Sequence, residues 1–189
     1  MSTYPALPAD GVHAHWADAN GTPAEQASLR WENEAWTVEA TLVEARAQAV
    51  LRVSAGWQVR QLLLFRDLPE PDLWLATDGG GRWGEVNGAH RDDLDGCTEL
   101  AVMGSVVTHI PSLRRLPLHV GHTAEMRVAV VDPMALSVVP ATWRYHRTGT
   151  HRWQVDQSTG DAPWRFDVDH HGLPLDVGPD RRRVIADVG

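Results

Sequence analysis

The sequence contains one cysteine, Cys97, among 189 residues. No disulfide can therefore form within the chain, and a zinc site built on cysteine ligands is excluded. The first residues lack both the basic segment and the apolar core of a secretory signal. The longest apolar runs, such as residues 62–65, are far too short to span a bilayer. We therefore expect a soluble cytoplasmic protein without a transmembrane segment.

The sequence also has few basic residues relative to acidic ones. The chain has 17 Lys and Arg residues against 25 Asp and Glu, which gives a formal net charge of -8 and a pI near 5.6. Binding to nucleic acid requires an electropositive surface, so we expect no nucleic-acid partner. A hydrophobic fraction of 43% is sufficient for a globular core, and this length suits a single domain.

Common catalytic and metal-binding motifs are missing as well. The sequence has no G-x-S-x-G nucleophile turn, no G-x-x-x-x-G-K phosphate loop and no G-x-G-x-x-G fingerprint. Its histidines include three close pairs, which are His13/His15, His119/His122 and His170/His171. Two histidines on one strand face could bind a metal, but none of these pairs has the H-E-x-x-H spacing. The simpler interpretation is solvent-facing histidines, so we expect no metal and no cofactor.

Carboxylates cluster in two places. Asp167 and Asp169 would share one face of a strand, as the catalytic pair of a glycosidase could. Phe166 and Val168 would then form the apolar face, so these carboxylates most simply point to water. Residues 92–95 most simply form a turn, because Asp readily bonds its own backbone there. We name no catalytic residue and expect binding rather than catalysis.

The dominant pattern in the sequence is the alternation of apolar and polar residues, with an apolar residue at every second position. Trp36, Val38, Ala40 and Leu42 would lie on one face of a strand, and Gly-rich turns such as residues 78–81 separate similar segments. Helical periodicity is weak, and its best candidate, residues 43–53, is read here as strand. The pattern predicts an all-β, antiparallel fold with few or no helices.

The chain divides into a short arm and one domain. Residues 1–11 are rich in Pro and Ala and are expected to form a loose N-terminal arm, whereas residues 12–189 form a single β domain. The pattern G-x-x-R-W occurs twice, at residues 79–83 and 149–153. This repetition is compatible with an internal duplication, although so short a match is weak evidence.

The segment VVTHIPSLRRLPL, residues 106–118, places Arg114 and Arg115 among apolar residues. If this stretch is extended, one guanidinium faces water and the other faces the interior. Burying an arginine costs several kcal/mol unless it is paired, and its planar fork suits carboxylate, phosphate or sugar oxygens. Two interpretations stay open: an internal salt bridge to an acid such as Glu99, or contact with a ligand.

The stretch from DLDGC at residues 93–97 to RRL at residues 114–116 resembles the bacterial family called "putative glycolipid-binding", formerly a domain of unknown function. Gly-Cys and Arg-Arg-Leu stand at the family's spacing without a gap, and Thr108 stands at the family's first threonine. Weaker similarity covers roughly residues 12–184. His109 replaces the family's asparagine and Ala101 its second aspartate, which identifies a divergent member.

This resemblance implies a single antiparallel sheet that curves into an open or half-barrel shape. We therefore predict a non-catalytic protein that binds a glycolipid-like or other amphiphilic small molecule in an apolar, Trp-lined cavity. One arginine, together with Thr108 and His109, would meet the polar headgroup. The expected ligand-binding residues are Arg114, Arg115, Thr108, His109, Trp83 and Tyr145.

Two alternatives of other classes stay open. The first is a hydrolase that uses His109 with a nearby carboxylate such as Glu99, since a general base must lie within hydrogen-bond reach of its target. The second is a protein-interaction module that uses a sheet edge or an apolar patch. The oligomeric state is not predicted.

Overall fold

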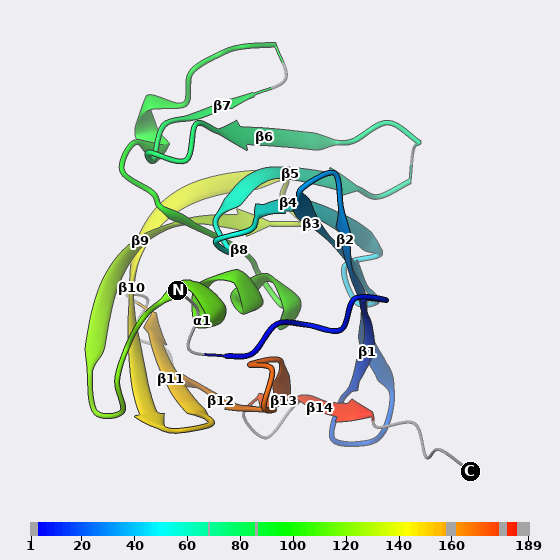
Figure 1. Ribbon diagram of the computed structural model, residues 1–189. Helices are drawn as coiled ribbons and strands as arrows, with labels where there is room; N and C mark the ends of the chain where they lie inside the picture. Colours follow the sequence, from blue (N-terminus) through cyan, green and yellow to red (C-terminus); the bar gives the residue numbers. More distant parts are fainter. Residues whose placement is uncertain (1–3, 68, 86, 158–161, 178–180, 185–189) are drawn as a thin grey trace.

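Fourteen strands form one continuous sheet in the computed structural model, which describes residues 4–67, 69–85, 87–157, 162–177 and 181–184 (Figure 1). In sheet order the strands are β7 (Trp83–Glu85), β6 (Leu73–Thr77), β5 (Val59–Phe65), β4 (Ala47–Ser54), β3 (Ala35–Leu42), β2 (Pro23–Glu32), β1 (Val12–Ala17), β14 (Arg181–Val184), β13 (Pro174–Val177), β12 (Trp164–Val168), β11 (Arg152–Gln157), β10 (Ser137–Gly149), β9 (Thr123–Asp132) and β8 (Glu99–Val102). All neighbours pair antiparallel except β8 and β9, which are parallel. The sheet curves strongly but does not close into a barrel. The predicted fold class is therefore confirmed.

The apolar alternation read from the sequence determines which face of each strand is buried. Trp36, Val38, Ala40 and Leu42 on β3 are all buried, and β4 shows the same alternation. Of the segment with ambiguous periodicity, residues 47–53 belong to strand β4 as predicted, whereas residues 43–46 form the turn before it. The predicted turn before β7 also forms: the Asp78 carboxylate accepts the Gly80 N–H at 2.6 Å. One side of the curved sheet thus becomes a continuous apolar face.

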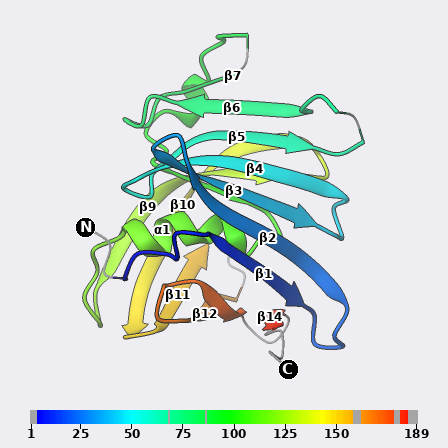
Figure 2. The ribbon, with the colours of Figure 1, turned by 45° about the vertical axis from the view of Figure 1, so that its right-hand side comes forward.

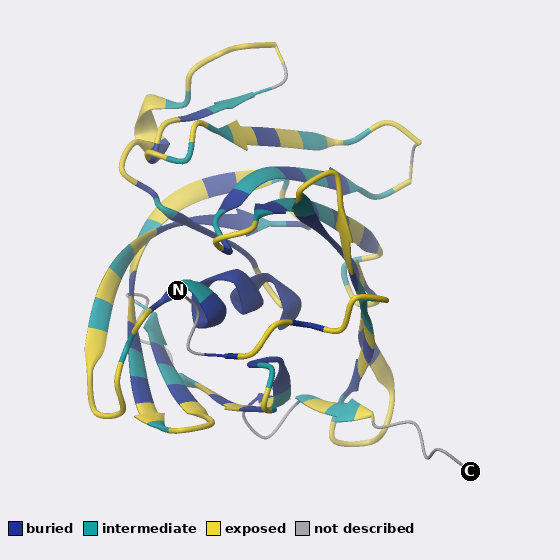
Figure 3. Ribbon diagram, viewed as in Figure 1, coloured by how far each residue is buried: buried dark blue, intermediate teal, exposed yellow. Residues whose placement is uncertain are grey.

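A short helical segment occupies the concave side of the sheet. It consists of the 3₁₀ turn η2 (Val107–His109) and the helix α1 (Ile110–Arg115). The extended conformation considered for residues 106–118 is therefore wrong over this part. Pro111 stands in the first turn of α1, where its fixed φ suits a helix and no N–H is needed. Val107, Ile110 and Leu113 are fully buried, and the burial colouring shows α1 enclosed by the sheet (Figure 3).

The helices in the described part of the chain are all short. None of them combines the length and apolar character that crossing a bilayer would require.

The N-terminal segment crosses the open side of the sheet in front of α1, as two views agree (Figures 1 and 2). Tyr4 and Leu7 are buried, so the arm expected to be loose contributes two side chains to the core. Trp153 donates its indole N–H to the Tyr4 hydroxyl at 2.7 Å. Gly172 packs so closely on the Tyr4 ring that an added Cβ would come within 2.6 Å of it. Residues 4–7 are therefore held by specific contacts.

Replacing Tyr4 with phenylalanine tests this placement. The substitution keeps the ring and removes the hydroxyl, which leaves the buried Trp153 N–H without its acceptor. We expect the free energy of unfolding to fall by about 1–2 kcal/mol, as measured by urea denaturation. Ala6 is exposed, so Ala6→Ser should change stability by less than about 0.5 kcal/mol. An unchanged stability in Tyr4→Phe would contradict the packed arm.

Candidate functional site

The structure brings together five of the six residues that the sequence singled out. Thr108, His109, Arg114 and Arg115 lie on η2 and α1, and Tyr145 reaches α1 from β10 through a hydrogen bond with Ser112. Trp83 lies apart, on β7 at the far end of the sheet, where its indole N–H donates to the Cys97 carbonyl at 2.8 Å (Figure 1).

Arg115 belongs to an internal network. It forms an ion pair with Glu99, a buried residue of β8. The Ser112 hydroxyl donates to the other oxygen of the same carboxylate at 2.5 Å. The Tyr145 hydroxyl joins through Ser112, and burial raises the pKa of Tyr145 to about 12. Arg115 therefore forms the internal salt bridge to Glu99, which was one of the two interpretations of the arginine pair.

Arg114 has a different environment. Only 2% of this residue is exposed, and its guanidinium donates to the main-chain carbonyls of His171 and, at 2.8 Å, Pro5. Its Cζ lies 4.2 Å from the centre of the Trp57 ring. Among the described residues no carboxylate forms an ion pair with it, since nearby Asp169 pairs with Arg183 at 2.8 Å. Burial accordingly lowers the pKa of Arg114 to about 10.

A row of tryptophans leads from Arg114 to the surface. Trp57 stacks on Trp36 with ring centres 5.3 Å apart, and Trp36 meets Trp31 edge-on at the same distance. Trp57 and Trp36 are buried, whereas Trp31 is 46% exposed. We call Arg114 with these three tryptophans the Arg114 site. It joins a buried cation to an aromatic surface that reaches solvent.

Trp57 adopts an unusual backbone conformation that the sequence did not reveal. It lies in the turn between β4 and β5 with a φ of 64°, a left-handed value that bulky residues avoid. Such strain persists only where surrounding contacts hold it, and it is concentrated at functional sites. The sequence-based interpretation predicted a Trp-lined cavity but named Trp83 as its tryptophan. The Gly-Trp step at residues 56–57 was the available signal for a special role of Trp57.

Thr108 and His109 are structural in this arrangement. The Thr108 hydroxyl accepts the Val102 N–H at 3.1 Å, which ties η2 to β8. The His109 ring lies 4.9–5.4 Å from the rings of Trp143, Trp164 and Phe166. Burial lowers the pKa of His109 to about 3. Its Nδ1 has no hydrogen-bond partner in the described part of the chain, so it would be a poor general base at neutral pH.

The paired acids and histidines do not form a reactive cluster. Asp167 pairs with Arg152 at 2.9 Å, whereas Asp169 pairs with Arg183 and accepts the N–H groups of a turn. His13 and His15 are exposed on β1. The described residues contain no group of three or more His, Cys, Asp or Glu that could hold a metal.

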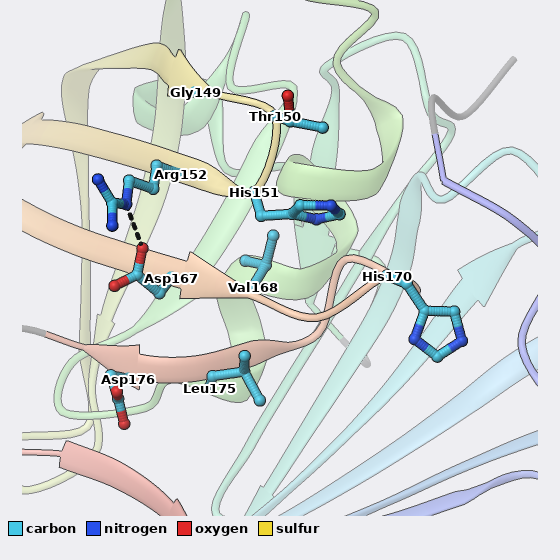
Figure 4. Close-up of a pocket in the computed structure, with 9 residues that line it drawn as sticks. All are labelled: Gly149, Thr150, His151, Arg152, Asp167, Val168, His170, Leu175 and Asp176. Atoms are coloured by element: carbon cyan, nitrogen blue, oxygen red, sulfur yellow. Dashed lines mark hydrogen bonds and ion pairs between the residues drawn. The ribbon is translucent and has the colours of Figure 1, made fainter.

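A wide surface hollow lies elsewhere, near the ends of β10–β13 (Figure 4). It measures about 620 Å³ and is crossed by the Arg152–Asp167 ion pair, whose side chains are both more than half exposed. Val168 and Leu175 add a small apolar area. It shares no residue with the Arg114 site, and it holds no buried polar group that would select a ligand.

The fold and this site define an open β half-barrel that encloses a short helix with a buried arginine, Arg114, which forms no ion pair with a carboxylate of the described residues. The chain belongs to the family described as "putative glycolipid-binding", whose model matches residues 13–181. A crystal structure of a DUF1089 family protein from Pseudomonas aeruginosa is similar, with a TM-score of 0.69 and 24% identity over 81% of this chain and 88% of that chain. At this identity the similarity concerns the fold. No match was found among curated proteins.

Proposed function

We propose that this protein is a non-catalytic binding protein for an amphiphile with an oxygen-rich headgroup, and that the headgroup contacts Arg114. The family description supports a binding role. The observation that carries the proposal is the buried guanidinium of Arg114, which lacks a carboxylate partner among the described residues. An unpaired buried charge costs stability, so its retention is accounted for if a ligand uses it.

The chemistry of the Arg114 site suits such a headgroup. A guanidinium donates in a planar fork to phosphate or sugar oxygens, and main-chain carbonyls now occupy two of its donors. Pro5, which provides one of those carbonyls, is exposed, and the proposal requires a ligand oxygen to replace this carbonyl at Arg114. At the surface end of the tryptophan row, the half-exposed Trp31 offers apolar area for a sugar ring or alkyl segment, whereas Trp57 and Trp36 are buried beneath it.

The other predicted residues then support the site rather than contact the ligand. Arg115, Thr108 and Tyr145 fix α1 against β8 and β10, and His109 fills an aromatic pocket. We assign no ligand contact to Trp83, because it lies outside this region. The expected cytoplasmic location is retained as part of the proposal.

Calorimetric titration with octyl glucoside below its micellar concentration, and with dihexanoyl phosphatidylglycerol, tests the proposal. Arg114→Lys keeps the charge but loses the fork and the broad contact with Trp57. We expect the affinity for at least one probe to fall tenfold or more, which corresponds to about 1.4 kcal/mol. Arg115→Lys is the matched control, because its partner is internal, and should change affinity less than threefold.

A second variant, at an exposed residue, keeps the proposal testable if Arg114→Lys does not fold. Trp31 is 46% exposed, so Trp31→Ala should leave the fold intact and weaken binding about threefold to tenfold. Trp74 on β6 is 37% exposed and lies outside the Arg114 site, so Trp74→Ala should bind normally. Unchanged affinity in both Arg114→Lys and Trp31→Ala, or no binding of either probe to the wild-type protein, would overturn the proposal.

A further inference from the structure

Turns from distant parts of the chain meet in a second hollow at the other end of the strands. The β3–β4 turn, the end of β8 and the β9–β10 turn enclose a pocket of about 290 Å³. Its lining consists of Ala24, Leu42, Glu44, Ala45, Met103, Gly104, Asp132, Pro133, Met134 and Arg181. We call it the methionine pocket.

The methionine pocket lies away from the Arg114 site. Trp31 lies near the end of β2, and Trp57 lies in the β4–β5 turn. The pocket is built on the β3–β4 turn, which the antiparallel order places at the opposite strand ends. The helical segment starts beside the pocket at Val107 and ends at the Arg114 site. Val107, Ile110 and Leu113 of this segment are fully buried. A ligand in one hollow would therefore not occupy the other.

Rigid backbone forms the floor of the pocket. Ala24 and Gly104 line it, and the residues that follow them are joined by a buried hydrogen bond, in which the Ser105 hydroxyl donates to the Glu25 carboxylate at 2.5 Å. The same carboxylate accepts the Val106 N–H at 2.7 Å. Arg66 holds the β9–β10 turn by donating a hydrogen bond to the Met134 carbonyl at 3.2 Å. The backbone is thus held while the methionine side chains remain free.

Two apolar residues of the lining are exposed to water. Met103 is 53% exposed and Met134 is 66% exposed, although both flank Leu42 and Pro133. Methionine is flexible and polarisable, and binding surfaces use it to fit ligands of varied shape. Burying these two side chains against an alkyl chain would contribute about 0.8 kcal/mol for each methylene removed from water.

Charges at the rim restrict which ligand would be accepted. Arg181 is the one cation in the lining, and it lies 3.9 Å from the Glu44 carboxylate. Asp132 adds a second carboxylate, which accepts the Met134 and Ala135 N–H groups. Two anions against one paired cation do not favour an anionic headgroup. An uncharged end group avoids this repulsion.

We propose that the methionine pocket binds the unbranched alkyl chain of an uncharged amphiphile, with the chain between Met103 and Met134 and the polar end at the rim. This second site does not depend on the Arg114 site.

Methyl NMR on protein labelled at the methionine methyl groups tests the proposal, with 1-octanol as the probe. Met103→Leu and Met134→Leu assign the two signals. We expect both to shift in a saturable manner, whereas Met126, half-buried on β9 outside the pocket, stays unchanged. Octanoate, which has the same chain length and a negative charge, should bind at least fivefold more weakly.

Three outcomes would overturn this inference. They are unshifted Met103 and Met134 signals up to the solubility of octanol, a non-saturating shift shared with Met126, and octanoate binding as tight as that of octanol. Met134→Glu should abolish the octanol-induced shift of Met103. Arg114→Lys should leave the octanol response intact, so failure at one site is distinguishable from failure at the other.

Discussion

Glu99→Leu is expected to lower the free energy of unfolding by about 3 kcal/mol, because it leaves the largely buried Arg115 guanidinium without its carboxylate. The Ser112 hydroxyl loses its acceptor in the same variant. The double variant Glu99→Leu, Arg115→Met should recover most of this loss, since an apolar pair of similar size needs no charge compensation. Urea denaturation at pH 7 measures all three proteins.

A surface ion pair provides the control for this cycle. Arg152 and Asp167 are 73% and 51% exposed and lie 2.9 Å apart. Asp167→Asn should therefore cost less than about 1 kcal/mol. If Glu99→Leu costs no more than Asp167→Asn, or if the double variant is as unstable as the single one, the buried pair does not have the role assigned to it.

Glu25 and His109 are expected to give stability two opposite dependences on pH. Burial raises the pKa of Glu25 to about 7. Between pH 4.5 and about 7 the folded protein therefore keeps a proton that the unfolded chain has released, and stability falls as pH rises, by about 3 kcal/mol in all. Burial lowers the pKa of His109 to about 3, so stability falls as pH drops from 6.5 to about 3, by about 5 kcal/mol.

Single variants separate the two contributions. Relative to wild type, Glu25→Gln should gain stability as pH rises from 4.5 to 7, because the destabilising ionisation of Glu25 is gone. His109→Leu should gain stability relative to wild type as pH falls from 6.5 toward 3. Leucine binds no proton, so protonation of residue 109 no longer favours the unfolded chain. Urea denaturation at each pH unit from 4 to 8 measures the differences. Curves that stay parallel to wild type would contradict these assignments.

Strands could be predicted from the sequence because each has one buried face. On β3 and β4 the apolar residues alternate with polar ones, and that alternation does not depend on distant neighbours. The segment containing α1 gave no such signal. It is enclosed on almost every side, so Ile110, Pro111, Ser112 and Leu113 are all buried and no polar face reveals a helical period.

The candidate site could be predicted only in part. The adjacent arginines identified the right segment, and Glu99 was named as an acid that could pair with one of them. Arg114 lies over the Trp57 ring, although the two residues are far apart in the chain. No local sequence pattern could therefore predict this contact. The arm was expected to be loose from its Pro and Ala content, but the contacts of Tyr4 with Trp153 and Gly172 come from far along the chain.

The strand order has a consequence for how the molecule assembles. Strands β1 to β7 and β8 to β14 each pair in chain order. In the sheet, the two halves are joined where β1 pairs with β14, through the positions Ala17–Arg182, Trp16–Arg183 and His15–Val184. Contacts between segments that are far apart along the chain have the largest entropic cost of loop closure. We therefore expect this seam, made by opposite ends of the polypeptide, to close last during folding and to be the first to open under mechanical load.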